Sequence, residues 1–120
     1  MKKILVIEDD KYLREVIVEK LKKEKYETLE AIDGEEGLKV TRDARPDLVV
    51  LDIILPKMNG FDYLEIKGKE SALAGIPVII LSNLGQPDDV ERGLALGAKD
   101  YMVKAHFTPN DLMEKVKGFL

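Results

Sequence analysis

Three carboxylates lie where they could act together. Glu8 and Asp9 directly follow the apolar run 4–7, and Asp52 interrupts a longer apolar run, where a buried charge is costly unless a partner compensates it. Acids after a strand usually solvate the turn and cap the next helix, and this simpler interpretation stays open for Glu8, Asp9 and Asp10. If the two runs are neighbouring strands, the carboxylates repel one another, which raises their pKa values or attracts a cation.

The donors available restrict the identity of that cation. The chain has no cysteine, and its single histidine, His106, cannot build a multi-histidine site and is interpreted as a surface residue. Oxygen ligands alone favour Mg²⁺, which also keeps positions for phosphate oxygens. Ser82 and Lys104 follow two further apolar runs, and each alone is typical of a turn or of solvent. Together with Asp9 and Asp52, a hydroxyl and an ammonium complete an anion pocket, which indicates phosphoryl transfer.

Five short apolar runs predict the scaffold that positions these groups. They occupy residues 4–7, 28–32, 48–51, 78–81 and 101–103. They are mostly continuous and rich in Val and Ile, which is typical of strands buried on both faces of a parallel sheet. Segments with helical periodicity separate them, so we expect an α/β fold with a doubly wound five-stranded parallel sheet. In such sheets the site lies beyond the carboxyl ends of the strands.

The connecting helices are predicted with unequal clarity. Apolar stripes mark the first and last helices, and Pro87 and Gly97 bracket a fourth helix of about ten residues. The second, from about 35 to 43, contains poor helix formers. The third begins after Gly60, but Lys67 and Gly68 occupy positions that should continue its apolar stripe. We therefore expect the third helix to be short or frayed.

Length and charge limit the function further. A chain of 120 residues predicts one domain, 1–120, with no room for a separate output module. The net charge is −4 and no basic stripe is present, so direct nucleic-acid binding is not expected. The apolar runs fall short of the ~20 residues that a membrane helix needs, and no signal peptide is apparent. The sequence therefore predicts a cytoplasmic protein.

Four separated motifs, in order, carry a resemblance to a known family. They are the segments 4–10, 46–60, 76–82 and 97–104, which read ILVIEDD, PDLVVLDIILPKMNG, IPVIILS and GAKDYMVK. Over essentially its whole length the chain resembles the receiver domain of two-component response regulators. The resemblance implies a flavodoxin-like (βα)5 fold with strand order 2-1-3-4-5.

The resemblance also implies how a phosphoryl group is taken up. Asp52 would accept it from the phosphohistidine of a sensor histidine kinase or from a phosphotransfer protein. Asp9, Asp52 and the backbone carbonyl of Ile54 would bind Mg²⁺, with Glu8 acting through water. The chain would then be a phosphoacceptor switch that assists its own phosphorylation and dephosphorylation, and not an enzyme with a separate substrate.

Further residues are implied to read out the phosphoryl group. Lys104 would pair with its oxygens, Ser82 would donate its hydroxyl, and Tyr101 would be the switch aromatic that turns inward. Tyr101 also has a structural interpretation, since a strand tyrosine is often only packing. A downstream effector or a second copy would bind the face formed by the fourth helix, fifth strand and fifth helix.

Two departures and two alternatives accompany this interpretation. The family's proline after the lysine is replaced by Ala105, so we expect a trans bond after Lys104, a reshaped and more mobile loop, and an ammonium that still points toward Asp52. Asn83 replaces a small residue. One alternative is a receiver-like interaction module without phosphorylation, and another is a flavin- or nucleotide-binding protein on the same fold. The segment 8–11, which reads EDDK, disfavours the latter because it repels phosphate unless a cation intervenes.

Overall fold

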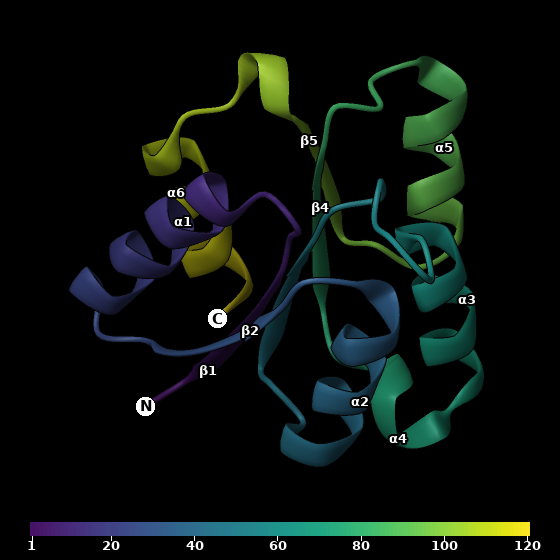
Figure 1. Ribbon diagram of the computed structural model, residues 1–120, viewed down its shortest axis with the longest axis horizontal. Coiled ribbons are helices and arrows are strands. Elements are labelled where there is room, and N and C mark those ends of the chain that lie inside the picture. Colours follow the sequence, from purple (N-terminus) through teal and green to yellow (C-terminus); the bar gives the residue numbers. More distant parts are fainter.

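Five parallel strands form one sheet in the computed structural model, which describes residues 1–120 (Figure 1). They are β1 (Lys3–Ile7), β2 (Glu27–Ala31), β3 (Leu48–Leu51), β4 (Val78–Ser82) and β5 (Asp100–Val103). Their order, β2-β1-β3-β4-β5, confirms the doubly wound α/β sheet expected from the apolar runs. The strand order reverses at β1, so β1 and β3 are direct neighbours.

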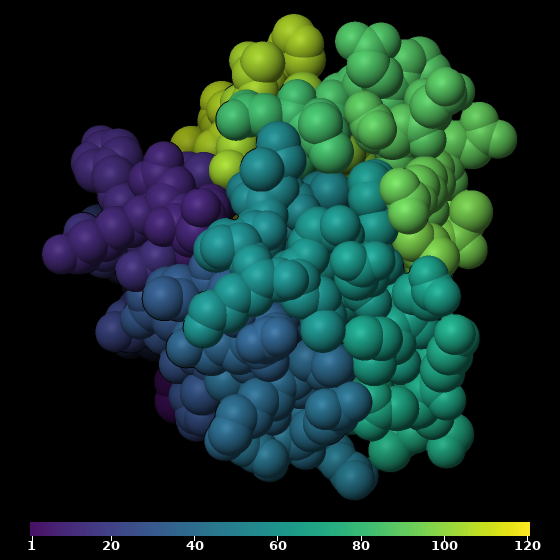
Figure 2. All heavy atoms as spheres, turned by 45° about the vertical axis from the view of Figure 1, so that its right-hand side comes forward, coloured from purple at the N-terminus to yellow at the C-terminus, as the bar shows by residue number.

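Helices cover both faces of the sheet (Figure 1). They are α1 (Lys11–Lys23), α2 (Gly34–Ala44), α3 (Gly60–Lys69), α4 (Ser71–Ala74), α5 (Pro87–Ala95) and α6 (Pro109–Phe119). Because the single turn α4 is additional, the fourth and fifth helices expected from the sequence are α5 and α6. On the space-filling surface, teal α3 lies between blue α2 and green α5 (Figure 2). None of these helices combines the length with the apolar composition that a membrane-spanning helix requires.

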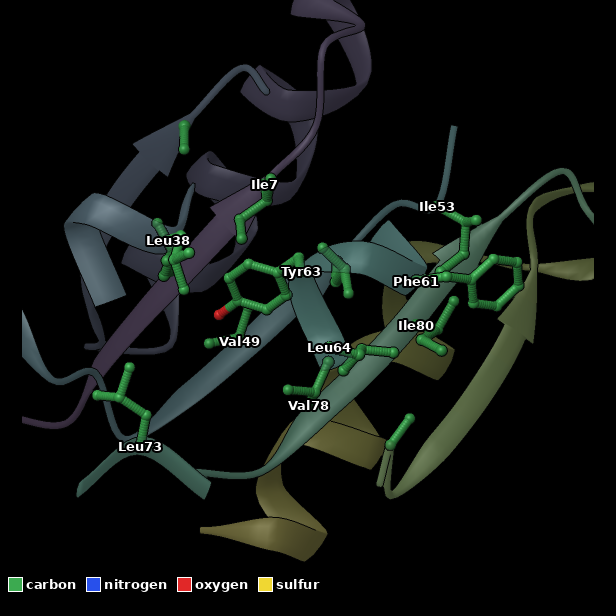
Figure 3. Packing of buried hydrophobic residues seen from close by; sticks show 14 residues of the cluster. Ile7, Leu38, Val49, Ile53, Phe61, Tyr63, Leu64, Leu73, Val78 and Ile80 are labelled. Carbon is green, nitrogen blue, oxygen red and sulfur yellow. The ribbon is translucent and has the colours of Figure 1, made fainter. Parts of the chain in front are cut away.

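The strands supply two separate cores, one on each face. Leu5 and Ile7 belong to a cluster of 14 buried residues beneath α2 and α3, while Ile4 and Val6 belong to a cluster of 12 beneath α1 and α6. Tyr63 is fully buried in the first cluster (Figure 3). Alternate residues of each central strand therefore face opposite cores, which explains why the runs are continuous rather than alternating.

The expectation of a short or frayed third helix is wrong. Asn59 caps the N-terminus of α3 by accepting a hydrogen bond from the Asp62 backbone, and the helix continues through Lys67 and Gly68 to Lys69. Lys67 is only 5% exposed, because its methylene stem packs as an apolar residue would. Its ammonium donates to the Ala74 carbonyl at 3.4 Å. A lysine can thus continue an apolar stripe where its end meets an acceptor.

Candidate functional site

The sheet register brings the first acids together. Ile7 of β1 pairs with Leu51 of β3, so the residues that follow, Glu8 and Asp52, leave the sheet side by side. The Asp52 backbone N–H donates to the Ile7 carbonyl at 3.0 Å, which extends the ladder by one residue. Both carboxylates are buried, with 2% of Glu8 and 4% of Asp52 exposed, whereas Asp9 is exposed. The predicted meeting of the three acids is confirmed.

These acids form a cluster of suitable size for a cation. One carboxylate oxygen from each of Glu8, Asp9 and Asp52 lies within 4.8 Å of the others. The donors are all hard oxygen atoms, and the exposed Asp9 leaves the cluster open to solvent, so the residues fit a partly hydrated Mg²⁺. Ile54 lies at the opening, with 53% of its surface exposed, and its backbone N–H donates to Asp52 at 3.3 Å. The role of the Ile54 carbonyl as a ligand remains a prediction.

Lys104 reaches the cluster from the end of β5, the strand at one edge of the sheet. Ser82 pairs with Val103 in the β4–β5 register, which places the next residue, Lys104, at the carboxyl edge. Its Nζ lies 2.8 Å from Glu8 Oε1 and 2.9 Å from Asp52 Oδ2. The expectation that the ammonium points toward Asp52 is therefore confirmed.

This arrangement shifts the ionisation of both partners. Burial raises the pKa of Glu8 to about 7, although hydrogen bonds from Lys104 and the Asp10 backbone act in the opposite direction. For Lys104, burial acts to lower the pKa, but the hydrogen bonds to Glu8 and Asp52 outweigh it and leave the pKa raised. The ammonium is therefore retained as a fixed positive charge beside the acids.

Ser82 and Tyr101 are connected through a residue that the sequence did not single out. Ser82 is fully buried, and its Oγ accepts a hydrogen bond from the Leu84 N–H at 3.3 Å. The Tyr101 hydroxyl donates to the Leu84 carbonyl at 2.5 Å. The ring lies so close to α5 that a Cβ atom added at Gly93 of this helix would come within 3.0 Å of it. One residue, Leu84, thus links the serine to the aromatic ring, and the ring in turn lies on α5.

The segment after β5 follows the expected backbone isomer. Every peptide bond is trans, including the bond between Lys104 and Ala105. Lys104–His106 forms a single 3-10 turn, and His106 is exposed at its end, as expected of a surface residue. The greater mobility expected of this loop remains a prediction.

Beyond Asp9, the structure shows one helix cap that was expected and one contact that was not. Asp10 caps α1, because its Oδ1 accepts from the Leu13 N–H at 3.1 Å, so the capping interpretation holds for this acid. Arg14 donates from Nη1 to the Glu8 carbonyl at 2.8 Å. Its position one helical turn after Asp10 was the available signal, since residues i and i+4 share a helix face.

Comparisons with known proteins show the family to which this fold belongs. The family model of the response regulator receiver domain matches residues 4–117, so the chain belongs to the response regulator receiver domain family. It is 40% identical over 119 residues to the probable transcriptional regulator ycf27 of Cyanophora paradoxa, covering 99% of this chain and 48% of that protein. It is 38% identical over 118 residues to the DNA-binding response regulator MtrA of Mycolicibacterium smegmatis, covering 98% and 50%. The chain therefore spans about half the length of these curated relatives.

Solved structures show the same architecture. The receiver domain of Francisella response regulator 1452 superposes with a TM-score of 0.92 at 32% identity, covering 99% of this chain and 96% of that chain. The chemotaxis response regulator CheY4 of Vibrio cholerae gives a TM-score of 0.92 at 29% identity, covering 100% and 99%. The predicted flavodoxin-like (βα)5 fold is confirmed, and the chain is a receiver domain homologous to two-component response regulators.

Proposed function

We propose that residues 1–120 act as one receiver domain in which Asp52 accepts a phosphoryl group with the help of Mg²⁺. The observation that carries this proposal is the Asp52 carboxylate itself, which is buried at a strand end, belongs to the acid cluster and contacts the Lys104 ammonium. Glu8, Asp9, Asp52 and the Ile54 carbonyl would hold the ion. When bound, Mg²⁺ supplies positive charge to the phosphoryl oxygens.

The residues of this chain then have distinct tasks in the transfer. A carboxylate oxygen of Asp52 attacks the phosphorus of a phosphohistidine, so a P–O bond forms while the P–N bond breaks and its electron pair returns to the imidazole. The loose transition state needs mainly positioning and charge neutralisation. Lys104 neutralises phosphoryl charge, and the buried Ser82 hydroxyl donates to a phosphoryl oxygen. The same pocket assists later hydrolysis of the acyl phosphate.

The proposal is tested by intact-mass spectrometry after incubation with a small phosphodonor and Mg²⁺. The parent is expected to gain the mass of one phosphoryl group, and Asp52→Asn is expected to gain none. Asp33→Asn is the matched control, because Asp33 is also buried after a strand but caps α2, a task that asparagine performs equally well. If Asp52→Asn gains phosphate as readily as the parent, the assignment is wrong.

Mg²⁺ dependence has its own variant. Asp9 is exposed, so Asp9→Asn removes one cation ligand with little cost to packing. We expect slower phosphorylation and weaker Mg²⁺ binding without loss of the fold. Equal Mg²⁺ affinity in Asp9→Asn and the parent would contradict the placement of the ion.

We propose that a partner recognises the phosphorylation state of the domain at the face formed by α5, β5 and α6. The support for this face is the connection from Ser82 through Leu84 to Tyr101, whose ring lies on α5. A sensor histidine kinase or phosphotransfer protein in the cytoplasm would supply the phosphoryl group, and a downstream effector or a second copy would bind this face. MtrA is named as DNA-binding, and we propose that such activity resides outside the half of MtrA that this chain matches. Size-exclusion chromatography before and after phosphorylation tests self-association. Tyr101→Ala is expected to reduce the change in elution volume that phosphorylation causes in the parent.

A further inference from the structure

The Glu8 carbonyl needs a partner that the sheet does not provide. Glu8 is 2% exposed and lies just beyond the end of β1. Its N–H still donates to the Ala31 carbonyl of the neighbouring strand β2 at 3.0 Å. A buried carbonyl without a donor is costly. Arg14 supplies the donor, with Nη1 at 2.8 Å. This hydrogen bond fixes the planar peptide that joins Glu8 to Asp9.

A second contact neutralises the arginine. Arg14 Nε lies 3.0 Å from Glu30 Oε1, and the arginine side chain is only 13% exposed. Glu30 is on the edge strand β2, opposite Val6 of β1. A lone guanidinium close to three carboxylates would compete with a bound cation for their negative charge. Glu30 reduces this competition, so Arg14 can hold the backbone without repelling a divalent ion.

We propose that Arg14 is a positioning residue for the divalent cation, and that Glu30 is its neutralising partner. The inference rests on the proposed Mg²⁺ site. Arg14 holds the Glu8–Asp9 peptide, and this peptide directs the Glu8 and Asp9 carboxylates toward the same point. Glu8 is fixed further by the Asp10 N–H, which donates to Glu8 Oε2 at 3.1 Å. The loop is thus ordered before the ion arrives, which spares the ion the cost of ordering it.

A merely structural arginine would behave differently from a positioning one. If Arg14 served only to attach α1 to the sheet, its removal would lower the stability but leave the Mg²⁺ affinity of the folded protein unchanged. The chain offers a matched control in Arg42, which pairs with Glu70 through Nη2 at 2.7 Å and Nε at 3.0 Å, away from the acid cluster. Arg42→Ala removes a guanidinium–carboxylate pair without touching the β1–α1 connection.

The experiment is a calorimetric Mg²⁺ titration of the parent, Arg14→Ala, Arg14→Lys and Arg42→Ala. We expect Arg14→Ala to bind Mg²⁺ about tenfold more weakly, the usual size of the effect when a group that orients a ligand is removed. Arg14→Lys is expected to recover part of the loss, because an ammonium can reach one partner but lacks the planar fork that reaches both. Arg42→Ala is expected to match the parent.

A second readout does not involve the ion at all. In metal-free protein, amide hydrogen exchange at Asp9 and Asp10 should be faster in Arg14→Ala than in Arg42→Ala, because the peptide is no longer held. Unchanged Mg²⁺ affinity in Arg14→Ala overturns the inference. If Arg14→Ala does not fold, Glu30→Gln replaces it, and weaker Mg²⁺ binding at low salt than in the parent is then required. A parent that binds no Mg²⁺ refutes the proposed cation site itself, which separates the two failures.

Discussion

Two lysine side chains are withdrawn from solvent at opposite ends of the sheet, and their surroundings differ. Lys104, at the carboxyl end, has carboxylate oxygens at 2.8 and 2.9 Å. Lys67, at the other end, has a single carbonyl at 3.4 Å and lies near Lys99. Burial acts to lower the pKa of both ammonium groups. The pKa of Lys67 is therefore lowered, and Lys99 lowers it further. The pKa of Lys104 is raised instead, because its carboxylate partners outweigh the effect of burial.

The comparison shows that burial alone does not identify a functional charge. At Lys67 the methylene stem contributes packing and the ammonium is a cost that one weak acceptor partly offsets. At Lys104 the ammonium balances acids that would otherwise repel one another. Because its partners keep Lys104 charged, its ammonium would be available to interact with a bound phosphoryl group. We call Lys104 the matched charge and Lys67, which has no carboxylate partner, the unmatched charge.

Removal of the matched charge should have the largest effect. Lys104→Met keeps a side chain of similar length but removes the ammonium group that contacts both Glu8 and Asp52. We expect the metal-free protein to lose about 2–3 kcal/mol of unfolding free energy, at the low end of such losses because Glu8 can take up a proton. Phosphorylation by a small phosphodonor should slow about a hundredfold. Urea denaturation and the rate of mass gain measure the two effects, and a variant as stable and as reactive as the parent would refute the charge-balance account.

The Glu8 carboxyl should make metal-free stability depend on pH. Its pKa is raised from 4.5 to about 7 in the fold, so between these values the folded state holds a proton that the unfolded state has released. The stability contributed by this group is complete below the unfolded pKa and is lost as the pH rises through the folded pKa. Glu8→Gln removes that dependence. Between about pH 5 and about pH 8 the variant should gain about 1–2 kcal/mol relative to the parent, after allowance for screening.

Chemical denaturation of metal-free protein across this pH range measures the difference. His106→Ala is the control, because it removes the single, exposed histidine of the chain, and it should leave the parent's pH dependence in place. A constant gap between Glu8→Gln and the parent at every pH would contradict the prediction.

Removal of the unmatched charge should stabilise the protein modestly. Lys67→Met keeps the packing of the stem and removes the ammonium, so we expect about 1 kcal/mol of added unfolding free energy near neutral pH. Because the pKa of Lys67 is lowered in the fold, the parent regains stability as the pH rises through that pKa, and the gap should narrow in alkaline solution. Phosphorylation should be unchanged. A loss of stability would show that the contact with the Ala74 carbonyl outweighs the cost of burial.

An exposed pair should show the smallest effect and separate pairing from burial. Lys115 Nζ lies 2.8 Å from Asp100 Oδ2, as close as Lys104 is to Glu8, but the lysine side chain is 49% exposed. Water and salt screen such a pair. Lys115→Ala should melt at a temperature that thermal denaturation cannot separate from that of the parent. A loss comparable to that of Lys104→Met would show that distance alone sets the value of an ion pair here.

Several local features were predictable because they depend on neighbouring residues along the chain. The run 48–51 coincides with β3, and Pro87 begins α5. The third helix was misjudged because Lys67 was assigned to the polar class, whereas its environment depends on α4, a turn with no clear sequence signal. Arg14 could have been placed on α1, but one of its partners lies on β2 and the other just beyond the end of β1.

The sequence by itself determined which groups stand at strand ends, since apolar continuity sets the strands and the next polar residue marks where each one stops. Only the tertiary structure decided which of these groups meet. Asp52 and Lys104 are 52 residues apart, and they touch because the β3–β4 and β4–β5 pairings carry both strand ends to one edge. Burial and pKa follow from that meeting, because desolvation and Coulomb energy depend on every neighbour in space. The two lysines are chemically identical in the sequence, and the fold alone makes one matched and the other unmatched.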